Sequence, residues 1–258
     1  FTGPPGVGKT SLAHIVAKEM AVMLHERIGQ VLSNMSAVNG LLLQSADRDI
    51  VFIDEAHEMP TSAQTLLYRA IEDHAIFIQT ARGDTMKMPV QQFTLIMATT
   101  DEYALLAPLR DRCKMILPFT FYNSDALAHI AAQRAIMLGI RLDDEVAIEI
   151  GKRSRGTPRL AIRLFEACHR YARSRGDDLV KREHFDRTVE LEGMGGDLGL
   201  GRDELAYLTY LGSQPGATVQ LHTLESVLGI HRRTIQTVIE PYLVREGFVE
   251  RTSVGRRI

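Results

Sequence analysis

The chain has 258 residues, enough for one to three domains, and its 45% hydrophobic and 24% charged residues are typical of a globular protein with a sizeable core. A formal net charge of −2 excludes a globally cationic surface, so nucleic acid binding would need a local basic cluster. The 2 cysteines, Cys113 and Cys168, lack metal-type spacing and favour a reducing, cytoplasmic compartment over a disulfide framework. The sequence has no apolar run long enough for a membrane span, so no membrane contact is expected.

Short apolar strands alternate with helical segments over about the first 120 residues, which predicts an α/β fold around a largely parallel sheet. The predicted strands, Ile50–Ile53 and Phe93–Ala98, are apolar runs typical of strands buried on both faces. A helix is predicted from about Thr61 to Glu72. An alternating stretch follows from Ala75 to Val90, and Arg82–Asp84 at its centre indicates a β-hairpin.

The pattern changes to a helical period after this region. Ser124 and Asp143 are the predicted N-caps of two helices, and Thr157-Pro158 places an N-cap before a proline at the first position of another. A further helix lies near Lys181–Leu191. These segments predict a small all-helical domain.

The last part of the chain follows a glycine-rich joint at Gly193–Gly196. Helices are predicted at Asp203–Leu211, Leu221–Leu228 and His231–Leu243, with a hairpin at Phe248–Arg257. This order is that of a winged helix-turn-helix.

The strongest motif is a complete phosphate-binding loop, GPPGVGKT, at residues 3–10. Its glycines let backbone N–H groups turn toward phosphate oxygens, and the following helix adds its positive N-terminus. In such a loop Lys9 reaches the β- and γ-phosphates and Thr10 binds Mg²⁺. A chance glycine turn is the alternative, which the match at every fixed position disfavours. The predicted ATP-binding residues of the loop are Gly3, Gly6, Gly8, Lys9, Thr10 and Ser11.

An acidic pair, Asp54-Glu55, follows the predicted strand Ile50–Ile53. At the end of a strand Asp54 is expected to bind ATP through its Mg²⁺, and Glu55 to orient or deprotonate the attacking water. An exposed acidic turn is the alternative. The loop in the same α/β unit favours the catalytic interpretation, with ATP and Mg²⁺ as cofactors.

These motifs, with the segments that follow them, resemble the RuvB family of AAA+ ATPases. Phe93–Thr100 resembles the family's sensor-1 strand, which implies that Thr100 lies beside the γ-phosphate. Leu109–Arg112 resembles the arginine-finger segment, and Arg112 is the matching catalytic residue, which would reach the ATP of a neighbouring subunit. A surface arginine in a turn is the alternative.

The resemblance implies further ATP-binding residues. Glu72 and Asp73 match an acidic pair that touches the nucleotide, and Tyr122 matches an aromatic residue that packs near it. Arg153–Arg159 is similar to the sensor-2 segment, with Arg159 in the first turn of a helix, directed toward the phosphates.

The last segment also resembles the family's winged helix, in Asp197–Leu200, Thr234–Gln236, Ile239–Leu243, Gly247-Phe248 and Arg251-Thr252. This implies that Arg251 and Arg256 bind DNA, with charge added by Arg232, Arg233 and Arg257. A winged helix used only for protein contact is the alternative.

The sequence departs from the family pattern at several places. Cys113-Lys114 follows Arg112 where the family has Phe-Gly, His74 replaces an aromatic residue, and Ser253-Val254 stands where the family has Pro-Arg. The stretch Ala75–Val90, which matches the hairpin that docks on the partner RuvA, is short, and His25–Ala37 lacks a Ser-Gly-Pro.

The resemblance implies an AAA+ large ATPase domain at 1–122 with a parallel sheet, a helical lid at 123–192 and a winged-helix DNA-binding domain at 197–258. The expected function is ATP-driven branch migration of Holliday junctions by a homo-oligomeric ring, with a hexamer as the expected size. Expected partners are four-way junction or duplex DNA and a RuvA-like protein.

Two alternatives stay open from the residues alone. One is an AAA+ ATPase that remodels a protein complex, in the manner of a clamp loader or accessory factor. The other is an ATP-gated DNA-binding module without turnover, which the presence of Glu55 disfavours. Because Phe1 runs almost directly into the loop, we also expect that an N-terminal segment with the adenine contacts is missing.

Overall fold

The structure is a computed structural model that describes residues 1–79, 85–196 and 198–258. It divides into two compact units, Phe1–Phe121 and Tyr122–Ile258. The predicted hairpin turn at Arg82–Asp84 and residue Asp197 lie outside the described residues. Within the described part of the chain, no helix combines the length and apolar character that a membrane crossing requires.

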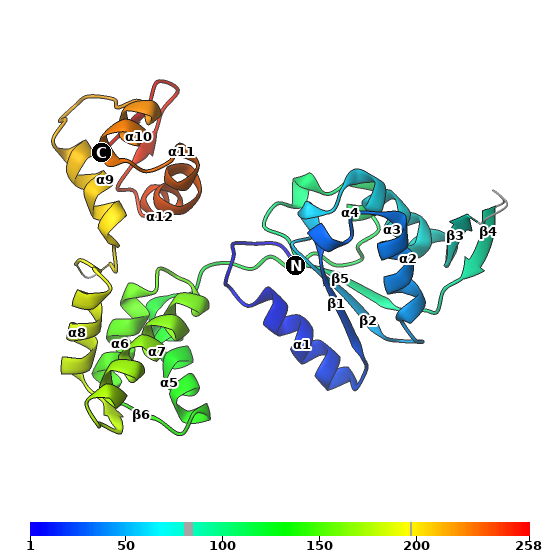
Figure 1. The fold of residues 1–258 in the computed structure, drawn as a ribbon, viewed down its shortest axis with the longest axis horizontal. Helices are drawn as coiled ribbons and strands as arrows, with labels where there is room; N and C mark the ends of the chain where they lie inside the picture. Colours follow the sequence, from blue (N-terminus) through cyan, green and yellow to red (C-terminus); the bar gives the residue numbers. More distant parts are fainter. Residues whose placement is uncertain (80–84, 197) are drawn as a thin grey trace. The chain divides into compact units, whose positions relative to one another are not determined.

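The first unit is built on a parallel sheet (Figure 1). Its strands are β1 (Leu24–Ile28), β2 (Ile50–Asp54) and β5 (Thr94–Met97), in the spatial order β1-β2-β5. Both neighbouring pairs are parallel, with Ile28 opposite Asp54 and Ile53 opposite Met97. The prediction of a parallel sheet is therefore confirmed, and β2 and β5 agree with the predicted strands to within one residue at each end.

The N-terminal residues extend this sheet beyond β5. The Thr99 N–H donates to the Phe1 carbonyl at 2.9 Å, and the Gly3 N–H donates to the Thr99 carbonyl at 3.2 Å. Thr2 forms parallel bridges to Thr99 on one side and to Pro118 on the other. The glycine loop therefore leaves the sheet beside the carboxyl end of β5.

Helices cover both faces of the sheet: α1 (Lys9–Met20) on one face, α2 (Met35–Gln44) and α3 (Thr61–Asp73) on the other. Successive side chains of a strand point to opposite faces. Accordingly, Val51 and Ile53 pack with the core residues of α2 and α3, whereas Phe52 packs with Ala13 and Ala17 of α1. Burial on both faces explains the apolar run at β2.

An antiparallel hairpin, β3 (Ala75–Gln79) and β4 (Thr85–Pro89), follows α3. Its register pairs Ala75 with Pro89, and this confirms the prediction of two strands in the alternating stretch. Short helices complete the unit: η1 (Gly29–Val31), η2 (Ala56–Glu58), η3 (Glu102–Ala104) and α4 (Ala107–Arg110).

The second unit begins with the predicted helical domain. Its helices are α5 (Ser124–Met137), α6 (Asp144–Arg153), α7 (Pro158–Ser174) and α8 (Arg182–Leu191). The predicted cap at Asp143 is confirmed, because its side chain accepts the Glu145 N–H. The predicted cap at Ser124 is wrong by one residue, since Asn123 accepts the Ala126 N–H at 2.8 Å.

Two further details correct the prediction for this domain. Thr157 precedes the helix as expected, but its hydroxyl donates back to the Arg155 carbonyl and does not cap the helix. The domain is not entirely helical, because β6 (Arg141–Leu142) and β7 (Leu179–Val180) form a short parallel pair. This pair joins the loop after α5 to the loop after α7.

The last segment forms the predicted winged helix: α9 (Arg202–Gly212), α10 (Leu221–Leu228), a third helical stretch and a wing of β8 (Glu250–Arg251) and β9 (Arg256–Arg257). The third stretch is not one regular helix. It consists of α11 (Arg232–Thr234), a π-helical turn η4 (Ile235–Ile239) and α12 (Glu240–Arg245). Pro241 has no N–H to donate to the preceding turn, and its ring crowds the carbonyl of Thr237, which accounts for the irregular turn.

A buried carboxylate holds the wing against this stretch. Glu240 is fully buried and accepts hydrogen bonds from the Tyr207 hydroxyl at 3.0 Å and the Arg256 Nε–H at 2.8 Å, and its Oε2 forms an ion pair with Arg251 Nε at 2.6 Å. Burial, together with the adjacent Glu240, raises the pKa of the Tyr207 hydroxyl, so it stays a donor. The wing, α9 and α12 are thus tied together at one point.

We expect Arg256→Ala to destabilise the winged helix by about 3 kcal/mol, because removing one partner leaves a buried carboxylate poorly compensated. Arg257→Ala is the matched control: Arg257 pairs with Glu250 at the surface, and such exposed pairs contribute less than about 1 kcal/mol. The measurement is amide hydrogen exchange of α9 in the full chain. Equal protection in the two variants would contradict the role given to Glu240.

Candidate functional site

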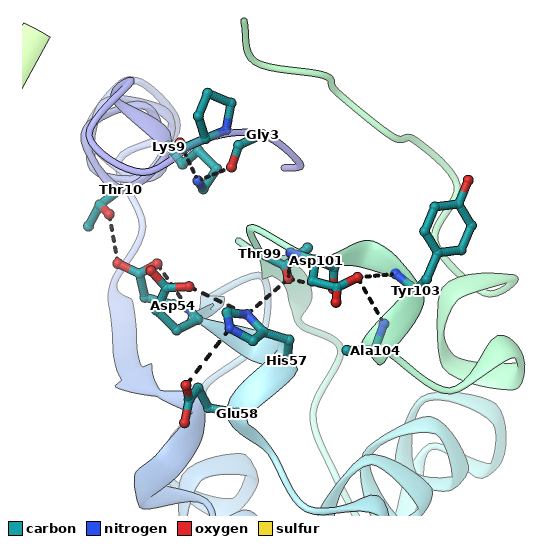
Figure 2. Close-up of polar contacts among 12 residues, drawn as sticks. Gly3, Lys9, Thr10, Asp54, His57, Glu58, Thr99, Asp101, Tyr103 and Ala104 are labelled. Carbon is teal, nitrogen blue, oxygen red and sulfur yellow. Dashed lines mark hydrogen bonds and ion pairs between the residues drawn. The ribbon is translucent and has the colours of Figure 1, made fainter. Parts of the chain in front are cut away.

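The site lies where the glycine loop and the end of β2 meet (Figure 2). The Thr10 hydroxyl, in the first turn of α1, donates to Asp54 Oδ2 at 2.7 Å. The residues that the sequence placed at one metal site are therefore in direct contact. A hydroxyl and a carboxylate are oxygen ligands of the kind that Mg²⁺ prefers.

The loop itself has the backbone that a phosphate cradle needs. Gly3 has a φ of +142°, and a Cβ there would overlap the carbonyl oxygen of Phe119. Gly8 has a φ of +100°, and the position of its missing Cβ has no protein atom within 4 Å. Lys9 is 6% exposed, and its Nζ donates to the carbonyls of Gly3 at 2.7 Å and Pro4 at 2.9 Å. The Lys9 ammonium group and the open space beside Gly8 fit a bound phosphate chain.

Glu55 follows directly after β2 in an unusual conformation. Its φ is +47°, a left-handed geometry that a residue with a Cβ seldom adopts. Its Oε2 is shielded from solvent, has no hydrogen-bond partner among the described residues, and lies 3.4 Å from His57 Nδ1. A carboxylate oxygen left with unused acceptor capacity is suited to binding a water molecule, as a general base must.

The sequence analysis missed two polar residues of the site: His57, which lies beside Glu55, and Thr99, which contacts His57. His57 Nδ1 contacts the Thr99 hydroxyl at 3.1 Å, and this hydroxyl donates to the Asp101 carbonyl at 2.9 Å (Figure 2). The sequence could have indicated His57 by its position two residues after Glu55. It could have indicated Thr99 by its position just after β5. Thr99 is buried, whereas the predicted Thr100 beside it is exposed.

The other predicted ATP-binding residues are placed as follows. Ser11 is exposed on α1. Tyr122 and Arg159 belong to the second unit, where Arg159 lies exposed in the first turn of α7, as predicted, and Tyr122 is also exposed. Asp73 is exposed at the end of α3.

The predicted finger Arg112 makes contacts within its own unit. Its Nη2 lies 2.7 Å from Glu72 Oε2, its guanidinium stacks 5.1 Å from the Tyr68 ring, and its Nη1 donates to the Pro108 carbonyl at 2.9 Å. Arg112 and Glu72, both predicted to touch a nucleotide, therefore contact each other. These contacts hold the guanidinium in a defined position at the surface.

The predicted DNA-binding arginines fall into two groups. Arg251 and Arg256 share the buried Glu240, and Arg257 binds Glu250 at 2.7 Å, so each of these arginines pairs with a carboxylate within the domain. Arg232 and Arg233 are exposed at the start of α11.

Models of three RuvB domains match the chain in sequence order. The Holliday junction DNA helicase RuvB P-loop domain matches residues 1–119, the RuvB AAA lid domain residues 122–194, and the RuvB C-terminal winged helix domain residues 197–258.

Individual relatives agree with these matches. The Holliday junction branch migration complex subunit RuvB of Campylobacter hominis is 37% identical over 261 residues, covering 100% of this chain and 76% of that protein. The protein of the same name from Anaeromyxobacter sp. (strain K) is 39% identical over 262 residues, covering 99% and 76%. The structure of the Thermotoga maritima RuvB Holliday junction branch migration motor superposes with a TM-score of 0.82 at 35% identity, covering 100% of this chain and 82% of that chain.

Substitution of Glu55 tests the site. We expect Glu55→Gln to slow ATP turnover by at least about a hundredfold while ATP affinity stays within a few-fold, because loss of a general base costs roughly 10²–10⁴ in rate. Lys9→Ala is expected to lose ATP binding, because it removes the charge that faces the phosphates. The measurements are steady-state turnover and fluorescent-nucleotide binding.

Glu58→Gln is the matched control, since Glu58 lies 3.8 Å from the other nitrogen of His57. It is expected to keep near-normal turnover. Normal turnover in Glu55→Gln would show that another group acts as the base.

Proposed function

Because this chain belongs to the RuvB family of Holliday junction DNA helicases, we propose that it drives branch migration of Holliday junctions by hydrolysing ATP. The observation that carries the proposal is the 2.7 Å contact between Thr10 and Asp54, with Glu55 next to it. These are the phosphate-loop hydroxyl, the strand-end carboxylate and the candidate base that a hydrolysing P-loop enzyme needs together.

The residues of the first unit have different roles in ATP hydrolysis. Lys9 and the N–H groups of the loop would bind the phosphates, and Thr10 and Asp54 would hold Mg²⁺. When bound, this ion would supply positive charge beside the phosphate oxygens. Glu55 orients the attacking water and takes up its proton. His57 lies beside the Glu55 carboxylate, and Thr99 contacts the His57 ring.

We assign Arg112 to the ATP site of a neighbouring subunit, in a homo-oligomeric ring with a hexamer as the proposed size. An arginine supplied in trans neutralises charge in the transition state of phosphoryl transfer. Its pairing with Glu72 and its stacking on Tyr68 support this role, because they fix the guanidinium before a neighbour binds. Thr100, Asp73, Tyr122 and Arg159 remain proposed nucleotide contacts.

The winged helix is proposed to bind DNA, and the hairpin of β3 and β4 to dock on a RuvA-like junction-binding protein. Arg232 and Arg233 at the start of α11 are the strongest candidates for DNA contact, because both are exposed. Arg251, Arg256 and Arg257 contribute less, since carboxylates within the domain compete for their charges. We also propose a cytoplasmic location, together with the DNA.

A comparison of DNA cofactors tests the motor function. The rate of ATP turnover is measured with four-way junction DNA, with linear duplex of equal length and without DNA, each with and without a RuvA protein. The proposal expects the highest turnover with junction and RuvA, together with strand exchange of the junction. If the rate of ATP turnover is the same with and without DNA and rises only when another protein complex is added, the result would favour the protein-remodelling alternative.

The ring assignment makes its own prediction. We expect Arg112→Ala to bind ATP and to hydrolyse it slowly, because a finger contributes roughly 10³–10⁵ in related phosphoryl transfers. Mixing it with the Lys9→Ala protein is expected to recover part of the activity, since some interfaces then combine an intact loop with an intact finger.

Arg110→Ala is the control for this experiment, because Arg110 lies two residues before Arg112, at the end of α4, and stacks on Tyr103 at 5.2 Å. It is expected to stay active. Full activity of Arg112→Ala by itself would rule out a role in trans.

The DNA assignment predicts a change in salt dependence. Each phosphate contact adds about 0.9 to the slope of log K against log salt. We therefore expect Arg232→Ala with Arg233→Ala to flatten this slope by about two for each subunit that contacts the duplex. The measurement is fluorescence anisotropy over a salt series.

The control is Arg170→Ala with Arg173→Ala, which removes the same charge from exposed positions of α7. An unchanged slope in the α11 variant would assign the winged helix to a protein partner.

A further inference from the structure

Arg155, in the loop between α6 and α7 of the helical domain, makes several contacts with the winged helix. Its Nε donates to the Gly199 carbonyl at 3.0 Å, and its Nη2 donates to the same oxygen. Its Nη1 lies 2.6 Å from Glu204 Oε1 in the first turn of α9. The two side chains are only 17% and 9% exposed, so this ion pair is largely shielded from water and from salt.

A second element of the winged helix reaches the same residue. Arg155 stacks on the ring of Tyr242 at 5.0 Å, and Arg245 stacks on the same ring at 5.0 Å. Arg245 Nη2 then donates to the Arg155 carbonyl at 3.0 Å. The Tyr242 hydroxyl donates to the Leu198 carbonyl at 3.3 Å. Two helices of the winged helix, α9 and α12, therefore both contact Arg155.

The backbone of Arg155 is held in a defined geometry. Its φ of +50° is left-handed, which is disfavoured for a residue with a Cβ, so its surroundings must determine it. The next carbonyl, of Gly156, accepts the Tyr122 N–H at 2.9 Å. α7 begins at Pro158, and Arg159 lies in its first turn. The contact to the winged helix is thus a few residues from the proposed sensor of the nucleotide.

We infer that Arg155 is a positioning residue that fixes the winged helix to the start of α7, so that a movement of α7 during ATP turnover is passed to bound DNA. The planar guanidinium suits this role, because it binds a carbonyl and a carboxylate in its plane and an aromatic ring on its face. The transfer of movement from α7 to bound DNA rests on the proposed motor function. The attachment of the winged helix to the start of α7 through Arg155 does not.

The geometry is tested by the distance between spin labels on the two domains of the full chain. Labels are placed at Arg170→Cys on α7 and at the exposed Val254→Cys on the wing, in a Cys113→Ser background. Cys168 stays unlabelled, because burial raises the pKa of its thiol to about 12. The labelled protein with Arg155 and Glu204 intact is expected to give one narrow distribution of distances between the two labels.

Arg155→Ala and Glu204→Gln are each expected to broaden this distribution, and the double variant to be no broader than Arg155→Ala alone. Arg155→Lys is expected to be intermediate, because it keeps the charge but loses the stacking and the second bond. An unchanged width in Arg155→Ala would overturn the inference.

The consequence is tested by branch migration per ATP hydrolysed. In Arg155→Ala this ratio is expected to fall about tenfold, a size typical of coupling between sites. Basal ATP turnover and duplex affinity are expected to stay within about twofold of normal, because within this segment Arg159, and not Arg155, is the proposed nucleotide contact, and Arg155 is not a proposed DNA contact. Arg163→Ala, an exposed arginine on α7, is the control and is expected to keep the normal ratio.

These readouts separate the two proposals. A broadened distribution with a normal ratio would overturn the role of Arg155 in coupling while leaving the motor function intact. A wild-type protein that does not respond to junction DNA would overturn the motor function, and the spin-label distances would still decide whether Arg155 fixes the joint.

Discussion

The contact between Thr10 and Asp54 is the constraint on which the active arrangement depends. It exists because β2 and the segment Phe1–Gly3 run in the same direction on either side of β5, so their carboxyl ends lie at one edge of the sheet. The apolar run of β2, buried on both faces, fixes the level at which Asp54 leaves the sheet. A loop that cradles phosphate would bind nucleotide without Asp54, but it would have no carboxylate beside its metal. The same register places Glu55, His57 and Thr99 next to that edge. The parallel sheet therefore positions both the groups that bind nucleotide and the groups that hydrolyse it.

The second unit is organised by buried ion pairs that join segments distant in the chain. Glu240 ties the wing to α9 and α12, and Arg155 ties α9 and α12 to the loop before α7. Buried pairs of this kind add little net stability compared with apolar packing, but they tolerate few alternative geometries. A module that must pass a movement from nucleotide to DNA benefits from such specificity more than from extra stability. The arginines of the wing, which the sequence analysis expected to bind DNA, also take part in such pairs within the domain.

Much of the fold could be predicted because its signals are local. The glycine loop, the apolar strand β2 and the proline at the start of α7 each depend on neighbouring residues alone. β1 was missed because its centre carries His25, Glu26 and Arg27. It lies beside a single neighbour, β2, in the described sheet, and there His25 finds a partner in Asp49, whose pKa this hydrogen bond lowers. The pairing of Arg112 with Glu72, and of Arg256 with Glu240, could not be predicted, because both depend on tertiary packing.

The central claim is that Thr10 and Asp54 form the metal-binding centre of an ATP-hydrolysing site. Its most direct test is the affinity of Mn²⁺ in the presence of ADP, measured by electron paramagnetic resonance on the full chain. The account predicts that the wild-type protein binds Mn²⁺ together with ADP. It also predicts that Thr10→Val and Asp54→Asn each weaken Mn²⁺ binding by at least about tenfold while metal-free ADP still binds. Unchanged Mn²⁺ affinity in both variants would contradict the account.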